Sequence, residues 1–289
     1  MSHLAEQSVS HNFKFKSLAY DLSGRTHIMG ILNVTPDSFS DGGVYLDVER
    51  AVAQGRRMVE QGADFIDIGG ESSRPGSDPV PSDEELRRIL PVIKGLVNTV
   101  SVPLSVDTYK SQVAKEALKA GVEIVNDITG ATFDTRMIDT VQEFDAGLVL
   151  MHMKGTPKTM QQDPSYEDVI DEVTGFLARQ AELAVAKGVK RIILDPGIGF
   201  GKSLLHNIEL LKNLHRISQL GYPVLVGPSR KSFIGKLLDA PVEARLEGTA
   251  AAVTVSILRG ANIVRVHDVE EMKKVAIIAD ALKGDPSTP

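Results

Sequence analysis

The feature that most constrains the fold is a repeated alternation of short apolar runs with longer segments of helical periodicity. Strands that alternate with helices form parallel sheets covered by crossover helices. Eight such units in a chain of 289 residues predict a single (β/α)8 barrel of the TIM type, because an open doubly wound sheet commonly has about six strands. The alternative is such an open sheet with a small appendage. The strand-like runs are residues 27–34, 64–69, 102–107, 122–127, 146–153, 191–195, 223–227 and 261–267.

Start and stop signals support the helical segments between these runs. Ser82 and Glu85 have the spacing of a capping box at the start of a helix. Segments 114–121 and 181–188 each end in Lys, one further residue and then Gly, which is a common helix C-terminus. These signals agree with the alternation of strands and helices.

The predicted barrel occupies residues 27–283, with an N-terminal extension over 1–26 and a C-terminal tail over 284–289. Two long loops, 33–43 and 70–78, follow the first and second strands and are rich in glycine, proline and oxygen-bearing side chains. Loops of this kind above a barrel mouth are typical of mobile lids.

Composition removes several classes of function. The 38 acidic residues outnumber 32 basic ones, so the basic surface of a nucleic-acid-binding protein is not expected. Without cysteine the chain has no disulfide, thiolate metal site or thiol nucleophile. The N-terminus has no signal-peptide pattern, and the longest small or apolar run, 249–258, is about half a membrane span. We therefore expect a soluble, cytoplasmic α/β protein that binds neither nucleic acid nor membrane.

Polar or glycine residues end nearly every predicted strand. In a barrel, the carboxyl ends of the strands converge on one mouth, where the active sites of this fold lie. The clustering therefore predicts a polar binding site at that mouth. The strand-end residues are Asn33, Asp67, Asp107, Asn126, His152, Asp195, Gly227 and His267.

The last strand carries the plainest signal for an anion. Side chains alternate along a strand, so Arg265 and His267 share one face while Val264 and Val266 take the other. Two potential cations at the mouth, one of them a planar fork of donors, suit a phosphate or pyrophosphate. The alternative is that Arg265 pairs with a carboxylate of the mouth for structural reasons.

Asp107 and Asp195 each end an apolar strand, where an unpaired carboxylate is costly. With Asn126 they form an acceptor set for a flat heterocycle rich in hydrogen-bond donors. Asp195 precedes Pro196-Gly197 and is equally suited to capping a turn. Asn126 also fits a turn position, so both interpretations stay open.

Two further segments lie near the predicted mouth. GIGFGKS (197–203) is not a phosphate-binding P-loop, because Pro196 stands where that motif needs its first glycine. Its glycines predict a sharp turn or a close approach of the backbone to a ligand. The basic segment 229–232 is either a solvent-exposed turn or, given its place, part of the site. His152 is expected to be an ordinary strand-end histidine.

Hard oxygen ligands are present at the mouth. Asn33 and a nearby carboxylate suit Mg²⁺ that is held jointly with a phosphate. The seven histidines are scattered and form no motif for a transition metal.

Eight motifs resemble those of the dihydropteroate synthases in order, spacing and register, over residues 27 to about 280. The resemblance implies a barrel transferase that joins 4-aminobenzoate to 6-hydroxymethyl-7,8-dihydropterin pyrophosphate. The products would be 7,8-dihydropteroate, a precursor of folate, and pyrophosphate. The motifs are GILNVTPDSFSDGG, DIGGESSRPG, SVDT, VNDITG, MHMKGTP, LDPGIGFGK, GPSRKSFIG and RVHDV.

The resemblance also implies roles for matched residues. Asn33 would bind Mg²⁺ together with the pyrophosphate, which Arg265 and His267 would hold. Asp41 and Arg74 would belong to the closing loops. Pterin would be bound by Asp107, Asn126, Asp195 and Lys231, with Asp195 facing the amino-pyrimidine edge. The aminobenzoate would be surrounded by Phe39, Ser73, Pro75, Lys231 and Ser232. Further substrate-binding positions would be Met151, Phe200, Gly227 and Val266.

One departure and two alternatives qualify the resemblance. Many members have Thr where this chain has Ser73, so a methyl group is lost close to the aminobenzoate, which sulfonamides imitate. A folate-dependent methyltransferase barrel would keep the pterin residues without needing the SRKSF segment or Mg²⁺. A non-catalytic pterin-binding paralogue would show damage at Asn33 or Arg265, and none is seen.

The small residues of the helix at 245–258 permit close packing, and the resemblance implies a homodimer there.

Overall fold

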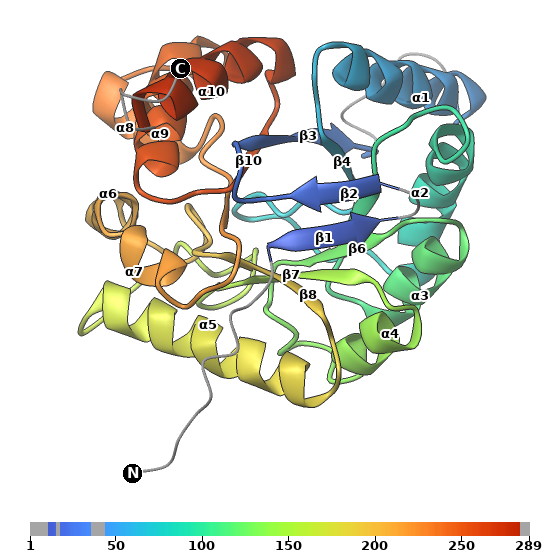
Figure 1. Ribbon diagram of the computed structural model, residues 1–289, viewed down its shortest axis with the longest axis horizontal. Helices are drawn as coiled ribbons and strands as arrows, with labels where there is room; N and C mark the ends of the chain where they lie inside the picture. Colours follow the sequence, from blue (N-terminus) through green and yellow to red (C-terminus); the bar gives the residue numbers. More distant parts are fainter. Residues whose placement is uncertain (1–10, 16–17, 36–43, 284–289) are drawn as a thin grey trace.

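The computed structural model describes residues 11–15, 18–35 and 44–283. Its main sheet is parallel and lies at the centre of a ring of helices (Figure 1). Every strand of this sheet falls within one of the runs predicted from the sequence. The strands are β3 (His27–Asn33), β4 (Phe65–Gly69), β5 (Leu104–Asp107), β6 (Ile124–Asp127), β7 (Gly147–Met151), β8 (Arg191–Asp195), β9 (Leu225–Val226) and β10 (Ile263–Val266).

The strand order shows that the sheet closes on itself. Neighbouring strands run in the order β8-β7-β6-β5-β4-β3-β10-β9, which leaves β8 and β9 at the ends. A parallel bridge pairs Leu194 with Val224, and the Leu194 N–H donates to Pro223 O at 2.9 Å. The barrel is therefore nearly closed, as predicted, and the open-sheet alternative is wrong.

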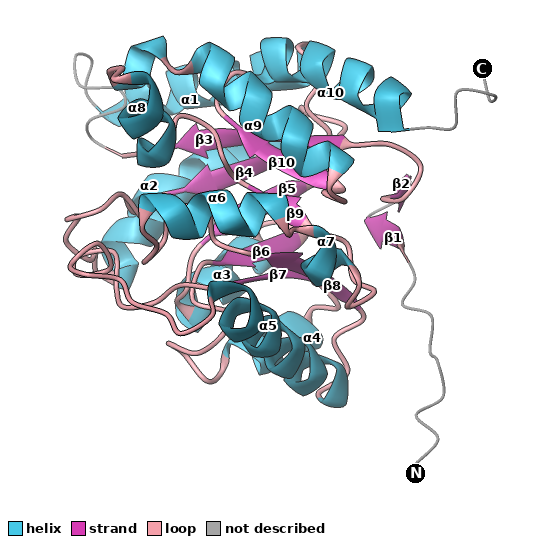
Figure 2. Ribbon diagram, turned by 90° about the vertical axis from the view of Figure 1, so that its left-hand side faces the viewer, coloured by secondary structure: helices cyan, strands magenta, loops and turns pink. Residues whose placement is uncertain are grey.

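Helices cover the outside of the barrel, with their apolar sides against the sheet (Figures 1 and 2). Gly121 and Gly188, at φ of 105° and 89°, follow two of them and confirm the predicted helix ends. No described helix is both long enough and apolar enough to cross a membrane. The helices are α1 (Val44–Glu60), α2 (Ser82–Leu96), α3 (Ser111–Lys119), α4 (Met137–Glu143), α5 (Val169–Ala186), α6 (Leu204–Lys212), α7 (His215–Ser218), α8 (Ser232–Leu238), α9 (Leu246–Leu258) and α10 (Val269–Lys283).

The capping box predicted at the start of α2 is wrong. Pro81 is the N-cap residue and Ser82 is already helical, with no side-chain hydrogen bond at the cap. The Glu85 side chain is buried and accepts a hydrogen bond from Lys110 Nζ at 2.5 Å. A buried carboxylate is stabilised more by an ammonium group than by a backbone N–H at an exposed helix start. The Glu85 side chain therefore bonds Lys110 and does not cap the helix.

A short antiparallel hairpin, β1 (Asn12–Phe15) and β2 (Leu18–Asp21), lies in the predicted N-terminal extension, for which the sequence predicts no strands. It lies across one opening of the barrel (Figure 1). Phe13 and Phe15 alternate with polar residues, so both rings point inward. They form an apolar cluster with Leu22, Met29, Phe65, Ile124, Val149, Ile193, Leu225 and Ile263.

This cluster divides the barrel interior. The end beside the hairpin is filled by aromatic and aliphatic side chains, while the polar strand-end residues lie at the carboxyl ends of the strands. Within the described part of the barrel interior, space for a ligand therefore lies at the carboxyl-end mouth, where sites of this fold occur.

We predict that Phe15→Ala lowers the free energy of unfolding by about 3–5 kcal/mol, because it opens a cavity in the apolar plug. Phe15 is 3% exposed, and its ring contacts the rings of Phe13, Tyr20 and Phe65 edge-on. Urea unfolding measures the change. The matched control is Leu205→Ala on α6, whose side chain is 73% exposed, with an expected change within about 0.5 kcal/mol. Equal effects of the two substitutions would contradict a stabilising role for the apolar cluster beneath the hairpin.

Candidate active site

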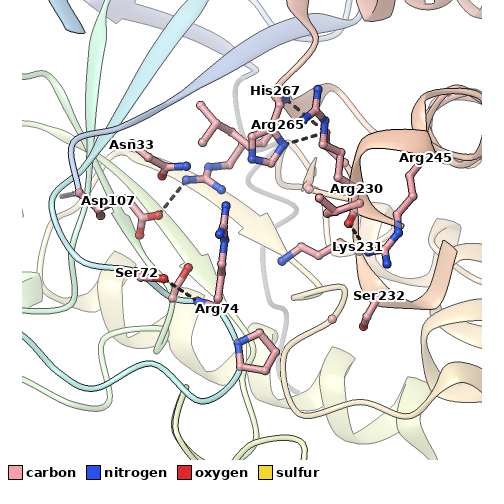
Figure 3. Close-up of a pocket in the computed structure, with 18 of the residues that line it drawn as sticks. Asn33, Ser72, Arg74, Asp107, Arg230, Lys231, Ser232, Arg245, Arg265 and His267 are labelled. Carbon is pink, nitrogen blue, oxygen red and sulfur yellow. Dashed lines mark hydrogen bonds and ion pairs between the residues drawn. The ribbon is translucent and has the colours of Figure 1, made fainter. Parts of the chain in front are cut away.

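A cavity of about 550 Å³ opens at the carboxyl-end mouth of the barrel (Figure 3). The ends of β3, β5 and β10, the loop after β4 and the segments that follow β9 form its walls. The lining residues are Ile31, Asn33, Thr35, Ser72, Ser73, Arg74, Pro75, Asp107, Met160, Gly199, Gly227, Ser229, Arg230, Lys231, Ser232, Val242, Arg245, Arg265 and His267.

A smaller recess adjoins this cavity. The two share Gly227, Lys231 and Arg265 as lining residues, so they form one continuous site. The remaining walls of the recess are Asn126, Ile128, Met151, Asp195, Ile198 and Phe200.

Most of the residues predicted for the site come together here. Val266 does not, because its side chain is fully buried in the core outside the barrel sheet, as the alternation along β10 requires. Phe39 and Asp41 lie outside the described residues. The cavity holds Asn33, Ser73, Arg74, Pro75, Asp107, Gly227, Lys231, Ser232, Arg265 and His267, and the recess holds Asn126, Met151, Asp195 and Phe200.

The cavity is strongly basic in a chain of net charge −6. Asp107 is the only carboxylate among the described residues that line it, whereas guanidinium or ammonium groups are numerous. Figure 3 shows Arg74 reaching from the loop after β4 into the space below Arg265. A ligand with several negative charges suits this excess. The basic residues are Arg74, Arg230, Lys231, Arg245 and Arg265.

Arg265 lies between two carboxylates. Its Nε donates to Asp67 Oδ2 at 2.6 Å and its Nη2 to Asp107 Oδ2 at 2.8 Å. Burial opposes the guanidinium charge, but the two carboxylates hold the pKa of Arg265 above its usual value. Burial likewise raises the pKa of Asp107, against the attraction of Arg265. The structural pairing considered in the sequence analysis is therefore present, and Arg265 lines the cavity as well.

The surroundings of His267 favour the neutral form of its imidazole. Burial, followed by the charges of Arg265 and Arg230, lowers its pKa to about 3. Ser229 Oγ accepts from the His267 backbone N–H at 3.2 Å and lies 3.0 Å from Nδ1. The Ser229 hydroxyl accepts from that N–H, and its own proton can be donated to Nδ1 of His267. This arrangement favours the His267 tautomer that carries its proton on Nε2. The lowered pKa favours a neutral His267 in the ligand-free protein, and a charged imidazole beside a bound anion stays a prediction.

Asp195 serves both of the roles that the sequence left open. Its Oδ1 accepts from the Gly197 N–H at 2.7 Å, as expected of a turn residue, and its carboxylate also lines the recess. Burial raises the pKa of Asp195 to about 6. Burial also lowers the pKa of Lys231 to about 8, and its Nζ lies 4.0 Å from the centre of the Phe200 ring.

The glycines of GIGFGKS let one loop pack directly on another. A Cβ at Gly197 would lie 2.0 Å from His152 O, and one at Gly201 would lie 2.2 Å from Lys154 O. Both have positive φ, of 69° and 63°, so the segment turns sharply, as predicted. Lys202 is buried and donates to the carbonyls of His152 and Phe200 at 3.1 and 3.0 Å. This lysine ties the two loops together and does not line the cavity.

The loop after β4 is held at both its base and its tip. Glu71 accepts hydrogen bonds from Tyr109 Oη and Lys110 Nζ in the loop after β5. At the tip, the Gly76 N–H donates to Pro157 O at 3.0 Å. These contacts support the part of the loop that carries Ser73 and Arg74. The mobility expected of this loop stays a prediction.

Arg230 and Arg245 line the cavity, although the sequence predicts no role for either residue. Arg230 pairs with Asp268 and has φ of 56°, and Arg245 donates to Arg230 O at 3.0 Å. Arg230 lies in the basic segment 229–232, whose position after β9 predicts a place near the mouth. Arg245 follows no motif, and only the packing of the start of α9 against α8 brings it to the cavity.

The mouth fits a magnesium ion that is shared with a ligand. No group of three or more His, Cys, Asp or Glu side chains that could hold a metal occurs among the described residues. The Asn33 side chain lines the basic cavity and offers one amide oxygen. Mg²⁺ commonly binds one or two protein oxygens and completes its shell with phosphate oxygens and water, so a single ligand here is compatible with it.

Comparisons with known proteins establish the family. The family model described as pterin binding enzyme matches residues 29–267. A dihydropteroate synthase of Synechocystis sp. is 49% identical over 266 residues, which cover 91% of this chain and 92% of that protein. This chain belongs to the dihydropteroate synthase family of pterin-binding enzymes.

Other family members agree with this assignment. The dihydropteroate synthase of Bacillus subtilis is 45% identical over 282 residues, covering 97% of this chain and 96% of that protein. A solved dihydropteroate synthase of Xanthomonas albilineans, with 4-aminobenzoic acid, matches at a TM-score of 0.89 and 43% identity. The match covers 96% of this chain and 100% of that one. The barrel of the family is thus shared along nearly the whole chain.

We predict that the His267 imidazole of the ligand-free protein stays neutral between about pH 8 and about pH 5, whereas a free histidine titrates near about 6.5. NMR chemical shifts of its ring nitrogens measure the charge. The unfolded chain takes up a proton below pH 6.5 that folded His267 does not, so this group lowers stability as the pH falls from 6.5 towards 3. A midpoint near 6.5 in the folded protein would contradict the assignment.

Proposed function

We propose that this family member condenses 6-hydroxymethyl-7,8-dihydropterin pyrophosphate with 4-aminobenzoate, forming 7,8-dihydropteroate and pyrophosphate. The observation that carries the proposal is one continuous site with two halves. A basic cavity around Arg265 adjoins a recess lined by the acceptors Asn126 and Asp195. Solved relatives from Xanthomonas albilineans are named as complexes with 4-aminobenzoic acid and with 7,8-dihydropteroate, which supports these substrates.

The recess suits the pterin ring. Asp195 and Asn126 offer acceptors to the ring N–H and amino groups, and Met151 and Phe200 supply apolar surface for its faces. A buried carboxylate facing two donors makes charge-assisted hydrogen bonds, which orient the ring. The basic cavity would then receive the pyrophosphate that the ring carries.

The task of the protein is to stabilise the leaving group. The C–O bond to pyrophosphate breaks with its electron pair on the oxygen, and electron donation from the pterin ring stabilises the resulting carbocation. The amine of 4-aminobenzoate then forms the C–N bond and loses a proton. Arg265 and Arg74 offset the growing negative charge, and His267 donates from Nε2. No covalent nucleophile is required.

Asn33 would hold Mg²⁺ together with the pyrophosphate oxygens. The ion supplies additional positive charge to the leaving group when it is bound. The Asn33 oxygen and Asp107 Oδ2 lie near a common point, 3.7 and 3.8 Å from the position of a Cβ built on Gly69.

The second substrate would lie at the outer part of the cavity. Ser73 and Pro75 line it from the loop after β4, and Lys231 and Ser232 line it at the start of α8. A relative from Yersinia pestis is named as a complex with a sulfonamide drug. We therefore propose that sulfonamides compete with 4-aminobenzoate in this chain.

A coupled assay of pyrophosphate release tests the proposed function. Release from the pterin substrate should require 4-aminobenzoate and should yield one equivalent of 7,8-dihydropteroate. Binding of pterin without any release would instead indicate the non-catalytic paralogue. Methyl transfer from a reduced folate to a corrinoid protein would indicate the methyltransferase alternative.

We predict that Asp195→Asn weakens pterin binding by about 2–3 kcal/mol, because the amide places a donor against one of the two ring donors. Binding of 4-aminobenzoate to the pyrophosphate-bound protein should change little, since Asp195 is not among the residues around the outer cavity. Isothermal titration calorimetry measures both affinities. Unchanged pterin affinity would remove Asp195 from the pocket.

We also propose a homodimer formed through α9 and α10. These helices expose Val255, Leu258, Ile277, Ile278 and Leu282, with 41% to 69% of each side chain accessible. Large apolar side chains gathered on one surface are typical of a subunit interface. The cytoplasmic location expected from the sequence stays a prediction.

We predict that Ile278→Glu converts the dimer to a monomer, because it places a charge within the proposed apolar interface. Sedimentation velocity measures the mass in solution. Leu183→Glu is the matched control, since Leu183 is 52% exposed on α5, which lies across the barrel from α10 (Figure 1). A monomeric unmodified protein, or equal effects of the two substitutions, would contradict this interface.

A further inference from the structure

Asp67 on β4 is a buried carboxylate that lines neither the cavity nor the recess. Its Oδ2 accepts two hydrogen bonds, from Arg265 Nε at 2.6 Å and from Asn126 Nδ2 at 2.9 Å. Its Oδ1 is buried and has no hydrogen-bond partner among the described residues. One oxygen atom therefore contacts Asn126, which lines the recess, and Arg265, which lines both the cavity and the recess.

The two partners of Asp67 come from strands that do not neighbour β4. In the sheet order, β5 separates β4 from β6, which carries Asn126, and β3 separates β4 from β10, which carries Arg265. Asp67 thus reaches across the barrel interior in both directions. No backbone hydrogen bond of the sheet could set the distance between those two side chains directly.

Each of the two bonds determines an orientation. Asp67 is an acceptor, so the amide nitrogen of Asn126 must face it and the amide oxygen must point elsewhere. For Arg265, Nε is held by Asp67 and Nη2 by Asp107, and two such bonds define the plane of a guanidinium. Figure 3 shows this guanidinium at the cavity wall, with its bond to Asp107.

We infer that Asp67 is a positioning residue that aligns Asn126 with Arg265 and so couples the pterin half of the site to the pyrophosphate half. The inference rests on the proposed function. The bond that breaks in the proposed reaction joins these two halves of one substrate. A fixed distance between Asn126 and Arg265 holds that bond in one position. Small displacements of the reacting atoms reduce the reaction rate strongly.

Calorimetry with two separate probes tests the inference. The probes are 6-hydroxymethylpterin, which lacks the pyrophosphate, and inorganic pyrophosphate in buffer that contains Mg²⁺. Asp67→Ala should weaken the binding of both by about 10- to 100-fold, because two groups lose a charged acceptor. Asp67→Asn keeps an acceptor oxygen and should bind the pterin within about threefold of the unmodified protein. Asp67→Leu, of similar shape, replaces Asp67→Ala if the latter does not fold.

Ser105→Ala is the matched control. Ser105 pairs with Asp67 in the sheet register, is equally buried, and its Oγ has no hydrogen-bond partner among the described residues. This substitution should leave both affinities within about twofold. Comparable losses in Ser105→Ala and Asp67→Ala would show a general disturbance of the barrel interior and would overturn the inference.

A double-mutant cycle separates positioning from a structural role. If Asp67 acts on the pterin through Asn126, Asp67→Ala should cost less pterin affinity in an Asn126→Ala background than in the unmodified protein. Its cost in pyrophosphate affinity should be the same in both backgrounds. Fully additive losses of pterin affinity, or unchanged binding of both probes in Asp67→Ala, would overturn the inference. Failure of the unmodified protein to bind either probe would instead contradict the proposed function.

Discussion

The architecture depends on how a barrel interior accommodates charge. Arg265 is stable there because Asp67 and Asp107 accept from its guanidinium at 2.6 and 2.8 Å. Removing one member of such a buried group leaves the others uncompensated, which costs far more than a surface ion pair. The hairpin fills the opposite end with Phe13 and Phe15, whereas Arg265 and its two carboxylates lie towards the carboxyl ends of the strands. The polarity of the interior thus determines where the site lies.

Support for the site comes from outside the cavity as well. Glu71 and Lys202 contact the loops that carry the lining residues, and neither lines the cavity itself. Lys202 bonds the carbonyl of Phe200, whose ring forms part of the recess and lies against Lys231. Buried polar groups with all partners in place hold their surroundings in one arrangement. The two halves of the substrate site therefore belong to one connected framework of loops and strand ends.

Much of this site was predictable from strand ends. Asn33, Asp107, Asn126, Asp195 and His267 follow apolar runs, and parallel strands bring their carboxyl ends together. The charge of His267 was not predictable, because its pKa reflects burial beside Arg265 and Arg230. The capping box at Ser82 failed for the same kind of reason, since Glu85 found Lys110 from another loop. In both cases a partner distant in the sequence outweighed the local pattern.

The sequence by itself determined the class of fold, the end of the barrel that holds the site and the family, because alternation and motifs are properties of neighbouring residues. Only the tertiary structure decided which side chains share partners. Nothing in the sequence places Arg245 at the cavity, or shows that Asp67 contacts Arg265 and Asn126 with one oxygen. These contacts arise when the sheet closes, since closure sets the distances across the barrel interior that no local segment contains.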